Sequence, residues 1–248
     1  MQTIRGLLKL LSTLVLALFI GSCSNFFTNS LATPFARDKS KLVPSVNAGN
    51  VSELIKLSAQ DPDLALVVLK KIETAIANAS DADKLTLQAA SIDAAANASG
   101  LGSAIFNSAG PIIDILSNGD LETETDKNEL IGVVASSIGG LGNLKESADS
   151  LASIIPSPSD TVAFNAFVAK ADPDQLAMAA IILLSSQANS SPGGTATYME
   201  SFDSESPSLN PQESLASELA VRAAQKYEAE GGTGPLADML SALNLYNK

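Results

Sequence analysis

The sequence predicts an all-α fold made of antiparallel helix pairs, and three observations support this. From Asn50 onward, apolar residues recur with a period near 3.6 over most of the chain. Residues that start helices, such as aspartate followed by proline, precede these stretches. No segment of strand length combines alternating apolar and polar residues with an enrichment in β-branched side chains.

Capping residues predict where each helix begins and ends. Start signals are a capping side chain followed by proline or by an acidic residue three positions later, at Asn50, Asp61, Ser80, Asp126, Asp172 and Asn210. Stop signals are Gly100, Gly119, Gly140 and Gly231. The helices predicted between these marks are 51–59, 62–78, 81–98, 102–117, 126–138, 143–154, 160–170, 173–188, 211–229 and 235–246. Short connections between them favour antiparallel neighbours.

The composition of residues 189–209 interrupts the helical pattern. Ser, Pro, Gly, Thr and acidic residues dominate there, which predicts a long disordered loop within the all-helical domain 50–248. The loop separates residues 50–188 from a C-terminal helical pair. We expect this pair to pack back on the body, because the apolar side chains of Leu215, Leu219 and Val221 would otherwise be exposed to water.

Two arrangements of the helices remain open, an irregular bundle and a short helical-repeat stack. The helix pairs, with small residues at their crossings, have a weak resemblance to tetratricopeptide-type repeats, whose consensus Trp, Leu, Gly and Tyr positions are not filled. Segments 60–66 and 171–178 both contain Asp-Pro-Asp, 111 residues apart. That spacing is not a multiple of a roughly 34-residue repeat, and shared helix capping explains the likeness equally well.

Residues 1–22 have the organisation of a secretory signal peptide. Arg5 and Lys9 precede an apolar stretch over 10–20, and small residues follow at Gly21 and Ser22. The apolar stretch is shorter than the roughly 18–20 residues that a membrane-spanning helix needs.

Cys23, the only cysteine, directly follows this segment. Ile20-Gly21-Ser22-Cys23 resembles the lipobox of bacterial lipoproteins, in which an aliphatic residue and two small residues precede cysteine. The resemblance covers about the first 24 residues. It implies cleavage before Cys23, a diacylglycerol on its sulfur and an acyl chain such as palmitate on its amine. Ser24, in place of aspartate, implies outer-membrane sorting. A free thiol behind an ordinary signal peptide or a transmembrane anchor is the alternative.

Residues 23–49 are predicted to form a flexible tether, rich in Ser, Asn, Thr and Pro. Basic residues gather at Arg37, Lys39 and Lys41. Without residues 1–22 the chain has 13 basic and 27 acidic residues, a net charge of −14. Such a charge repels nucleic acid, so we expect no nucleic-acid partner.

The residue types needed for common catalytic sites are missing. The chain contains no histidine, and its one cysteine is assigned to lipid, which excludes Ser-His-Asp triads, thiolate nucleophiles and histidine metal sites. Residues 140–145 begin like a dinucleotide-binding fingerprint, but Lys145 replaces the third glycine and no predicted strand precedes them, so we interpret them as a turn. We therefore predict no enzyme and no cofactor.

Carboxylates are the remaining candidate groups. Asp120, Glu122, Glu124 and Asp126 alternate, and an extended backbone would place them on one side for a cation such as calcium. We interpret them as a solvated acidic turn and predict no metal site. The pairs Asp61/Asp63 and Asp172/Asp174 are possible acid–base dyads, but their positions beside prolines indicate helix capping.

The sequence therefore predicts a lipid-anchored, non-catalytic helical module of the bacterial cell envelope. We expect it at the outer membrane, on the periplasmic or surface face, bound to an envelope protein. One alternative is a lipoprotein that binds a small hydrophobic ligand in a cavity left by small residues at 94–96 and 177–180. The other is a surface-exposed adhesin or antigen.

Overall fold

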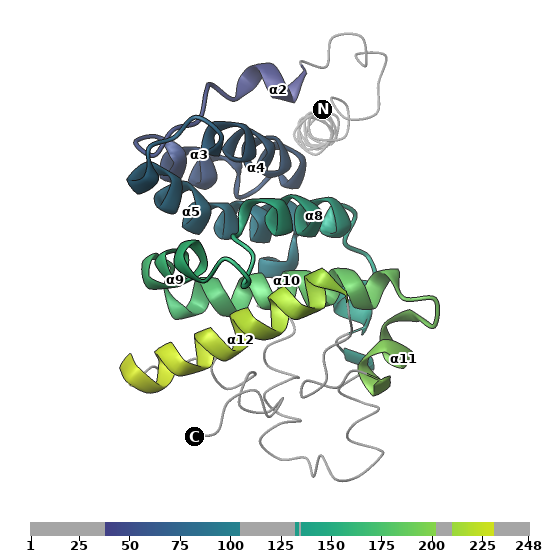
Figure 1. The fold of residues 1–248 in the computed structure, drawn as a ribbon. Helices are drawn as coiled ribbons and strands as arrows, with labels where there is room; N and C mark the ends of the chain where they lie inside the picture. The colour runs from purple at the N-terminus through teal and green to yellow at the C-terminus, as the bar shows by residue number, and fades with distance from the viewer. Residues whose placement is uncertain (1–37, 105–131, 134, 202–209, 231–248) are drawn as a thin grey trace, which may run out of the picture. The chain divides into compact units, whose positions relative to one another are not determined.

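The computed structural model describes residues 38–104, 132–133, 135–201 and 210–230 (Figure 1). All regular secondary structure in these residues is helical, which confirms the all-α prediction. The chain divides into two compact units, Met1–Leu42 and Val43–Lys248. The described part of the first unit is Asp38 and the short helix α2 (Lys39–Leu42).

The helices of the second unit follow the predicted pattern closely. They are α3 (Val51–Ser58), α4 (Pro62–Ile76), α5 (Asp81–Ser99), α8 (Leu144–Ile154), α9 (Thr161–Lys170), α10 (Pro173–Ser190), α11 (Gly194–Ser201) and α12 (Pro211–Glu230). Residues 101–104, 132–133 and 135–138 are also helical, within the predicted helices 102–117 and 126–138 or next to them. The rest of those two predictions, and the helix predicted over 235–246, lie outside the described residues.

Most of the described start signals act as predicted. The Asp61 carboxylate accepts a hydrogen bond from the Leu64 amide at 3.1 Å and caps α4. The Ser80 hydroxyl caps α5 in the same way, accepting from the Asp83 amide at 3.3 Å. Gly100, with φ of 71°, ends α5 in the left-handed conformation that glycine adopts without strain. Asp126 lies outside the described residues.

Asn50 does not cap α3, which corrects that prediction. Its side-chain oxygen accepts from the Asn47 amide at 2.9 Å, and its side-chain nitrogen donates to the Ser45 carbonyl at 2.9 Å. The Asn50 side chain therefore closes the turn before the helix, a local alternative to capping that short amide side chains often adopt.

Helices α5 and α10 form the centre of the second unit. Helix α5 packs against α3, α4, α8, α9 and α10, while α10 also contacts α8, α11 and α12. Figure 1 shows α12 lying along α10. The first helix of the predicted C-terminal pair therefore packs on the body, as expected. Because neighbours surround α5, its buried side chains do not lie on a single face, and they include Leu87, Ala94 and Ala98.

Large side chains fill the spaces between these helices. Phe164 and Phe167 of α9 are buried, with ring centroids 6.3 Å apart and ring planes tilted by 47°. The other largest fully buried side chains are Leu69, Ile72, Leu87, Ile92, Leu101, Leu144, Leu151, Leu176, Ile182 and Leu183. They belong to one hydrophobic core that holds the second unit together.

The tether predicted over 23–49 is too long. Val43 and Val46 are only 5% and 8% exposed and join the core, and the Lys71 ammonium donates to the Val43 carbonyl. Pro44 indicated a break in local structure, but an irregular segment can still bury apolar side chains. Residues 43–49 therefore belong to the folded body, and residues 23–37 lie outside the described part.

The disordered loop predicted over 189–209 is also wrong in part. Helix α10 continues to Ser190, and α11 covers residues 194–201. The Tyr198 hydroxyl donates to the buried Glu213 carboxylate of α12 at 2.8 Å, a long-range contact that composition does not reveal. Leu215 and Leu219 are buried as expected, whereas Val221 is 37% exposed. Residues 202–209 lie outside the described part.

Candidate functional site

Two of the candidate groups lie outside the described residues. They are Cys23, the predicted lipidation residue, and the carboxylates over 120–126, which are interpreted as a solvated turn. Their roles remain predictions. The described residues contain no group of three or more cysteines or carboxylates that could hold a metal ion.

In each of the two aspartate pairs, one member caps a helix and the other accepts a hydrogen bond from a distant side chain. Asp61 caps α4, and Asp63 accepts a hydrogen bond from the Asn143 side chain at 3.3 Å. Asp172 caps α10, accepting from the Gln175 amide at 2.7 Å. Their position on either side of a first-turn proline therefore serves helix initiation, as the sequence indicates.

One polar cluster lies at the N-terminus of α10, around Gln175. Its side-chain oxygen accepts from the Asp172 amide at 3.2 Å and completes a capping box. Its side-chain nitrogen donates to the Ala89 carbonyl at 3.3 Å and to the Asp93 carboxylate at 3.0 Å, both on α5. One glutamine thus starts α10 and joins it to α5.

This cluster perturbs the protonation of Asp93. Loss of hydration where α5 meets α10 raises the pKa of Asp93, and the Asp172 carboxylate raises it further. The hydrogen bond from Gln175 acts in the opposite direction but does not cancel these effects. A carboxyl group with a raised pKa suits proton transfer, but Asp93 already accepts the Gln175 amide.

Helix α12 completes this end of the body through Tyr227 and Lys226. The Tyr227 hydroxyl donates to the Asp174 carboxylate at 2.5 Å, and burial together with that carboxylate raises the pKa of Tyr227. The Lys226 ammonium donates to the Ala171 and Val168 carbonyls, at the C-terminal end of α9. These side chains fasten α12 to the connection between α9 and α10.

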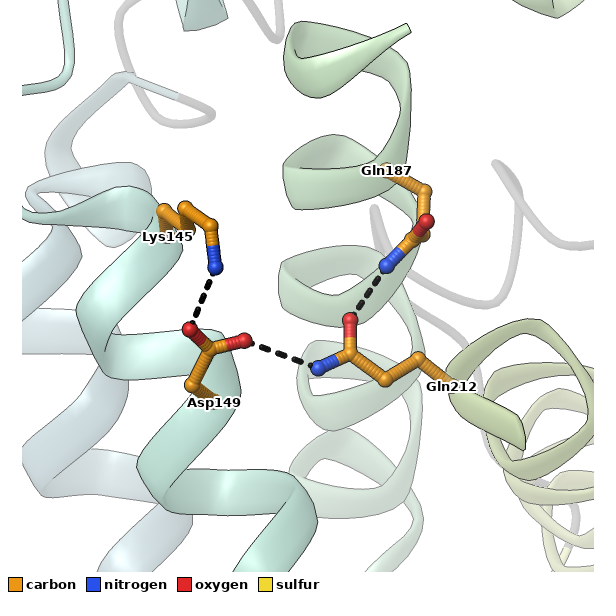
Figure 2. A network of polar contacts seen from close by, with 4 residues as sticks. All are labelled: Lys145, Asp149, Gln187 and Gln212. Atoms are coloured by element: carbon orange, nitrogen blue, oxygen red, sulfur yellow. Dashed lines mark hydrogen bonds and ion pairs between the residues drawn. The ribbon is translucent and has the colours of Figure 1, made fainter. Parts of the chain in front are cut away.

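A second polar network joins α8, α10 and α12 (Figure 2). The Lys145 ammonium donates to the Asp149 carboxylate at 2.6 Å, and the Gln212 side chain donates to the other Asp149 oxygen at 2.9 Å. The Gln187 side chain donates to Gln212, and Asn210 donates to Gln187 at 2.7 Å. The chain of bonds positions the start of α12 against α8 and α10.

The charges of this second network face water. The hydrogen bond from Lys145 is the main cause that lowers the pKa of Asp149, and Gln212 adds to it. The side chains of Lys145 and Asp149 are 70% and 49% exposed, so solvent screens their attraction. The network therefore orients helices more than it stabilises them.

Sequence reasoning missed most of these side chains. Gln175 was detectable, because glutamine three positions after a capping aspartate is a capping-box signal. Tyr227, Gln187 and Gln212 carry no local signal, since the partners of their side chains are 23 or more residues away. Residues 139–143 connect two helical segments, so the turn interpreted over 140–145 is present at its glycines, whereas Leu144 and Lys145 already belong to α8.

Comparisons with known proteins add no family to this description. No protein-family model matches the chain, and no curated protein or solved structure is significantly similar to it. Within the described ranges, none of the helices has the length and apolar character needed to cross a bilayer.

Proposed function

We propose that this chain is a lipid-anchored bacterial envelope lipoprotein whose helical body is a non-catalytic interaction module. The observation that carries the proposal is Cys23 at the end of Ile20-Gly21-Ser22-Cys23, behind a basic and then apolar segment. The only cysteine of the chain occupies the one position that lipid attachment requires. Two or more acyl chains on this residue hold a protein stably at a membrane.

The use of polar side chains in the body supports the non-catalytic part of the proposal. Asp61, Asp172 and Ser80 cap helices, and Gln175 and Tyr227 join one helix to another. These groups are engaged in holding a scaffold together. A scaffold with fixed helices presents a defined surface to a partner protein.

The burial of alanines favours this function over binding of a small apolar ligand. Ala94, Ala95, Ala177 and Ala179 are fully buried, and their helices α5 and α10 contact each other. Small side chains in such positions let helices approach closely. These alanines belong to the hydrophobic core of the body, which supports a rigid interaction module.

A cross-linking experiment in intact cells tests the proposal. The native chain, Cys23→Ala and the control Ser22→Ala, which keeps a small residue before the cysteine, are expressed at equal levels and captured after cross-linking. We expect one specific envelope protein with the native chain and the control, and its loss or strong reduction with Cys23→Ala. The absence of any specific envelope partner, at normal expression, would contradict the interaction function.

A further inference from the structure

We infer that residues 235–246, the segment of this chain that follows α12, dock as a helix on the outer face of α9. The inference goes beyond the function proposed above and does not depend on the lipid anchor. Its starting point is Val162 of α9. At 81% exposure, it is the most exposed large apolar side chain in the described part of the chain.

Helix α9 has a buried face and an exposed apolar face. Phe164 and Phe167 are buried, and α9 packs against α5. Val162, Ala166 and Ala169 are all exposed, and their spacings of four and three residues place them on one face of the helix, opposite the phenylalanines. An apolar face therefore points away from the core along the length of α9.

This outer face lacks the charges that water-facing helices usually carry. Residues 161–169 contain no aspartate, glutamate, lysine or arginine. Helix α8, by contrast, exposes Lys145, Glu146 and Asp149. A helix that faces water on its outer side is normally charged or polar there, as α8 is. The outer face of α9 instead has the composition of a surface that packs against another helix.

The end of α12 lies beside α9. The Lys226 ammonium donates to the Val168 carbonyl at 3.1 Å and to the Ala171 carbonyl at 2.5 Å. Helix α12 ends one turn later, at Glu230, so the chain continues from a point close to the C-terminal end of α9. Residues 231–234 connect to the next predicted helix and span at most about 14 Å. A connection this short keeps that helix near α9 and α12.

The sequence of residues 235–246 matches this apolar face. Leu236, Met239, Leu240 and Leu243 recur at spacings of three, one and three residues, which predicts a helix with one apolar face. Such a helix is about 18 Å long, close to the roughly 15 Å of the ten-residue α9. An isolated helix of this length is marginal in water, so its apolar face needs a partner.

Charge favours one direction for the docked segment. Lys170 is the only charged residue of α9, and Asp238 is the only charged residue of 235–246. A segment that starts at the C-terminal end of α9 and runs antiparallel to it brings these opposite charges to the same end. The same register sets Leu240 against Ala166.

Hydrogen exchange measured by mass spectrometry on the full chain tests the inference. We expect slow exchange at residues 235–246 in the native chain. Ala166→Asp should speed that exchange about ten-fold or more, because a carboxylate would lie against apolar side chains. Leu240→Asp should act in the same way from the other side of the contact. The matched control Ala59→Asp, at an exposed alanine after α3, should leave the exchange unchanged.

A disulfide identifies the occupant of the face directly. In a chain with Cys23→Ser, the introduced cysteines are the only ones. Ala166→Cys with Leu240→Cys should then form an intramolecular disulfide, whereas Ala59→Cys with Leu240→Cys should not. Docking of a peripheral helix is a local equilibrium, so changes on this face should leave the urea unfolding of the body nearly unchanged.

The contrary outcomes are equally specific. Exchange of residues 235–246 at the unprotected rate in the native chain overturns the inference. Protection that survives Ala166→Asp also overturns it, because the segment then packs elsewhere. A disulfide between two copies of the chain, or a loss of protection at residues 105–131 in Ala166→Asp without one at 235–246, assigns the face to another occupant and overturns it too.

Discussion

Replacement of Gln175 by alanine should destabilise the fold by about 2 kcal/mol. The change removes three hydrogen bonds of the side chain, to the Asp172 amide at 3.2 Å, the Ala89 carbonyl at 3.3 Å and the Asp93 carboxylate at 3.0 Å. The two long bonds to backbone groups contribute roughly 0.5 kcal/mol each, and the bond to the carboxylate about 1.5 kcal/mol. Because alanine has a higher helix propensity than glutamine, the substitution also stabilises the helix by a few tenths of a kcal/mol.

The assay is urea unfolding followed by far-ultraviolet circular dichroism, with the slope m compared between variants. Gln225→Ala is the matched control, because Gln225 is exposed on α12, and it should change the free energy of unfolding by less than about 0.5 kcal/mol. A loss below about 0.5 kcal/mol for Gln175→Ala, at unchanged m, would refute the role of Gln175 as the link between α5 and α10.

The pH dependence of the partner Asp93 gives a second, independent check of the same cluster. Because the pKa of Asp93 is raised above 3.8 in the folded chain, folding favours its protonated form. That stabilising contribution is complete below the unfolded pKa and is lost as pH rises through the folded pKa. Asp93→Asn should therefore be more stable than the native chain at neutral pH, and the difference should disappear in acid. A difference that does not change with pH contradicts the raised pKa.

Three further changes test the core, the surface network and a helix end. Phe167→Ala should cost about 3–5 kcal/mol in urea unfolding because the ring is fully buried, whereas Val162→Ala, at a side chain 81% exposed, should stay within about 0.5 kcal/mol. Lys145→Met should raise the pKa of Asp149 toward its ordinary value of 3.8, measured by nuclear magnetic resonance, because the Lys145 bond is the main cause of its lowering. In the native chain, that bond stabilises the fold above the unfolded pKa and loses its effect as pH falls through the folded pKa. Gly100→Ala should cost about 1–2 kcal/mol in thermal unfolding, because φ is 71° there and an alanine side chain is strained in that conformation; an unchanged melting temperature would contradict this.

Local chemistry determined how much of the fold could be predicted. The Asp61, Ser80 and Asp172 caps and the Gly100 stop lie within a few residues of the groups they satisfy, so the helix boundaries could be inferred from short segments. Asn50 shows the limit of this reasoning. Its side chain could either cap the helix or bond to the preceding turn, and in the structure it bonds to the turn.

Long-range packing accounts for the predictions that failed. Val43 and Val46 join a core whose other residues come later in the chain. The sequence of residues 23–49 alone does not predict this burial. Helix α11 forms in a segment whose composition favours a loop, and its Tyr198 bonds to Glu213, fifteen residues later. The contacts of Tyr227 and Gln212 are equally distant in sequence, whereas the lipidation proposed at Cys23 rests on a motif that is entirely local in sequence.

The mass of the mature N-terminal peptide, isolated from the membranes of expressing cells, tests the central claim most directly. The account predicts a peptide that begins at Cys23 and carries a diacylglycerol and an acyl chain, and a Cys23→Ser chain that carries neither. A native chain that retains residues 1–22, or one cut elsewhere with a free Cys23 thiol, would contradict the proposed anchor and the function built on it.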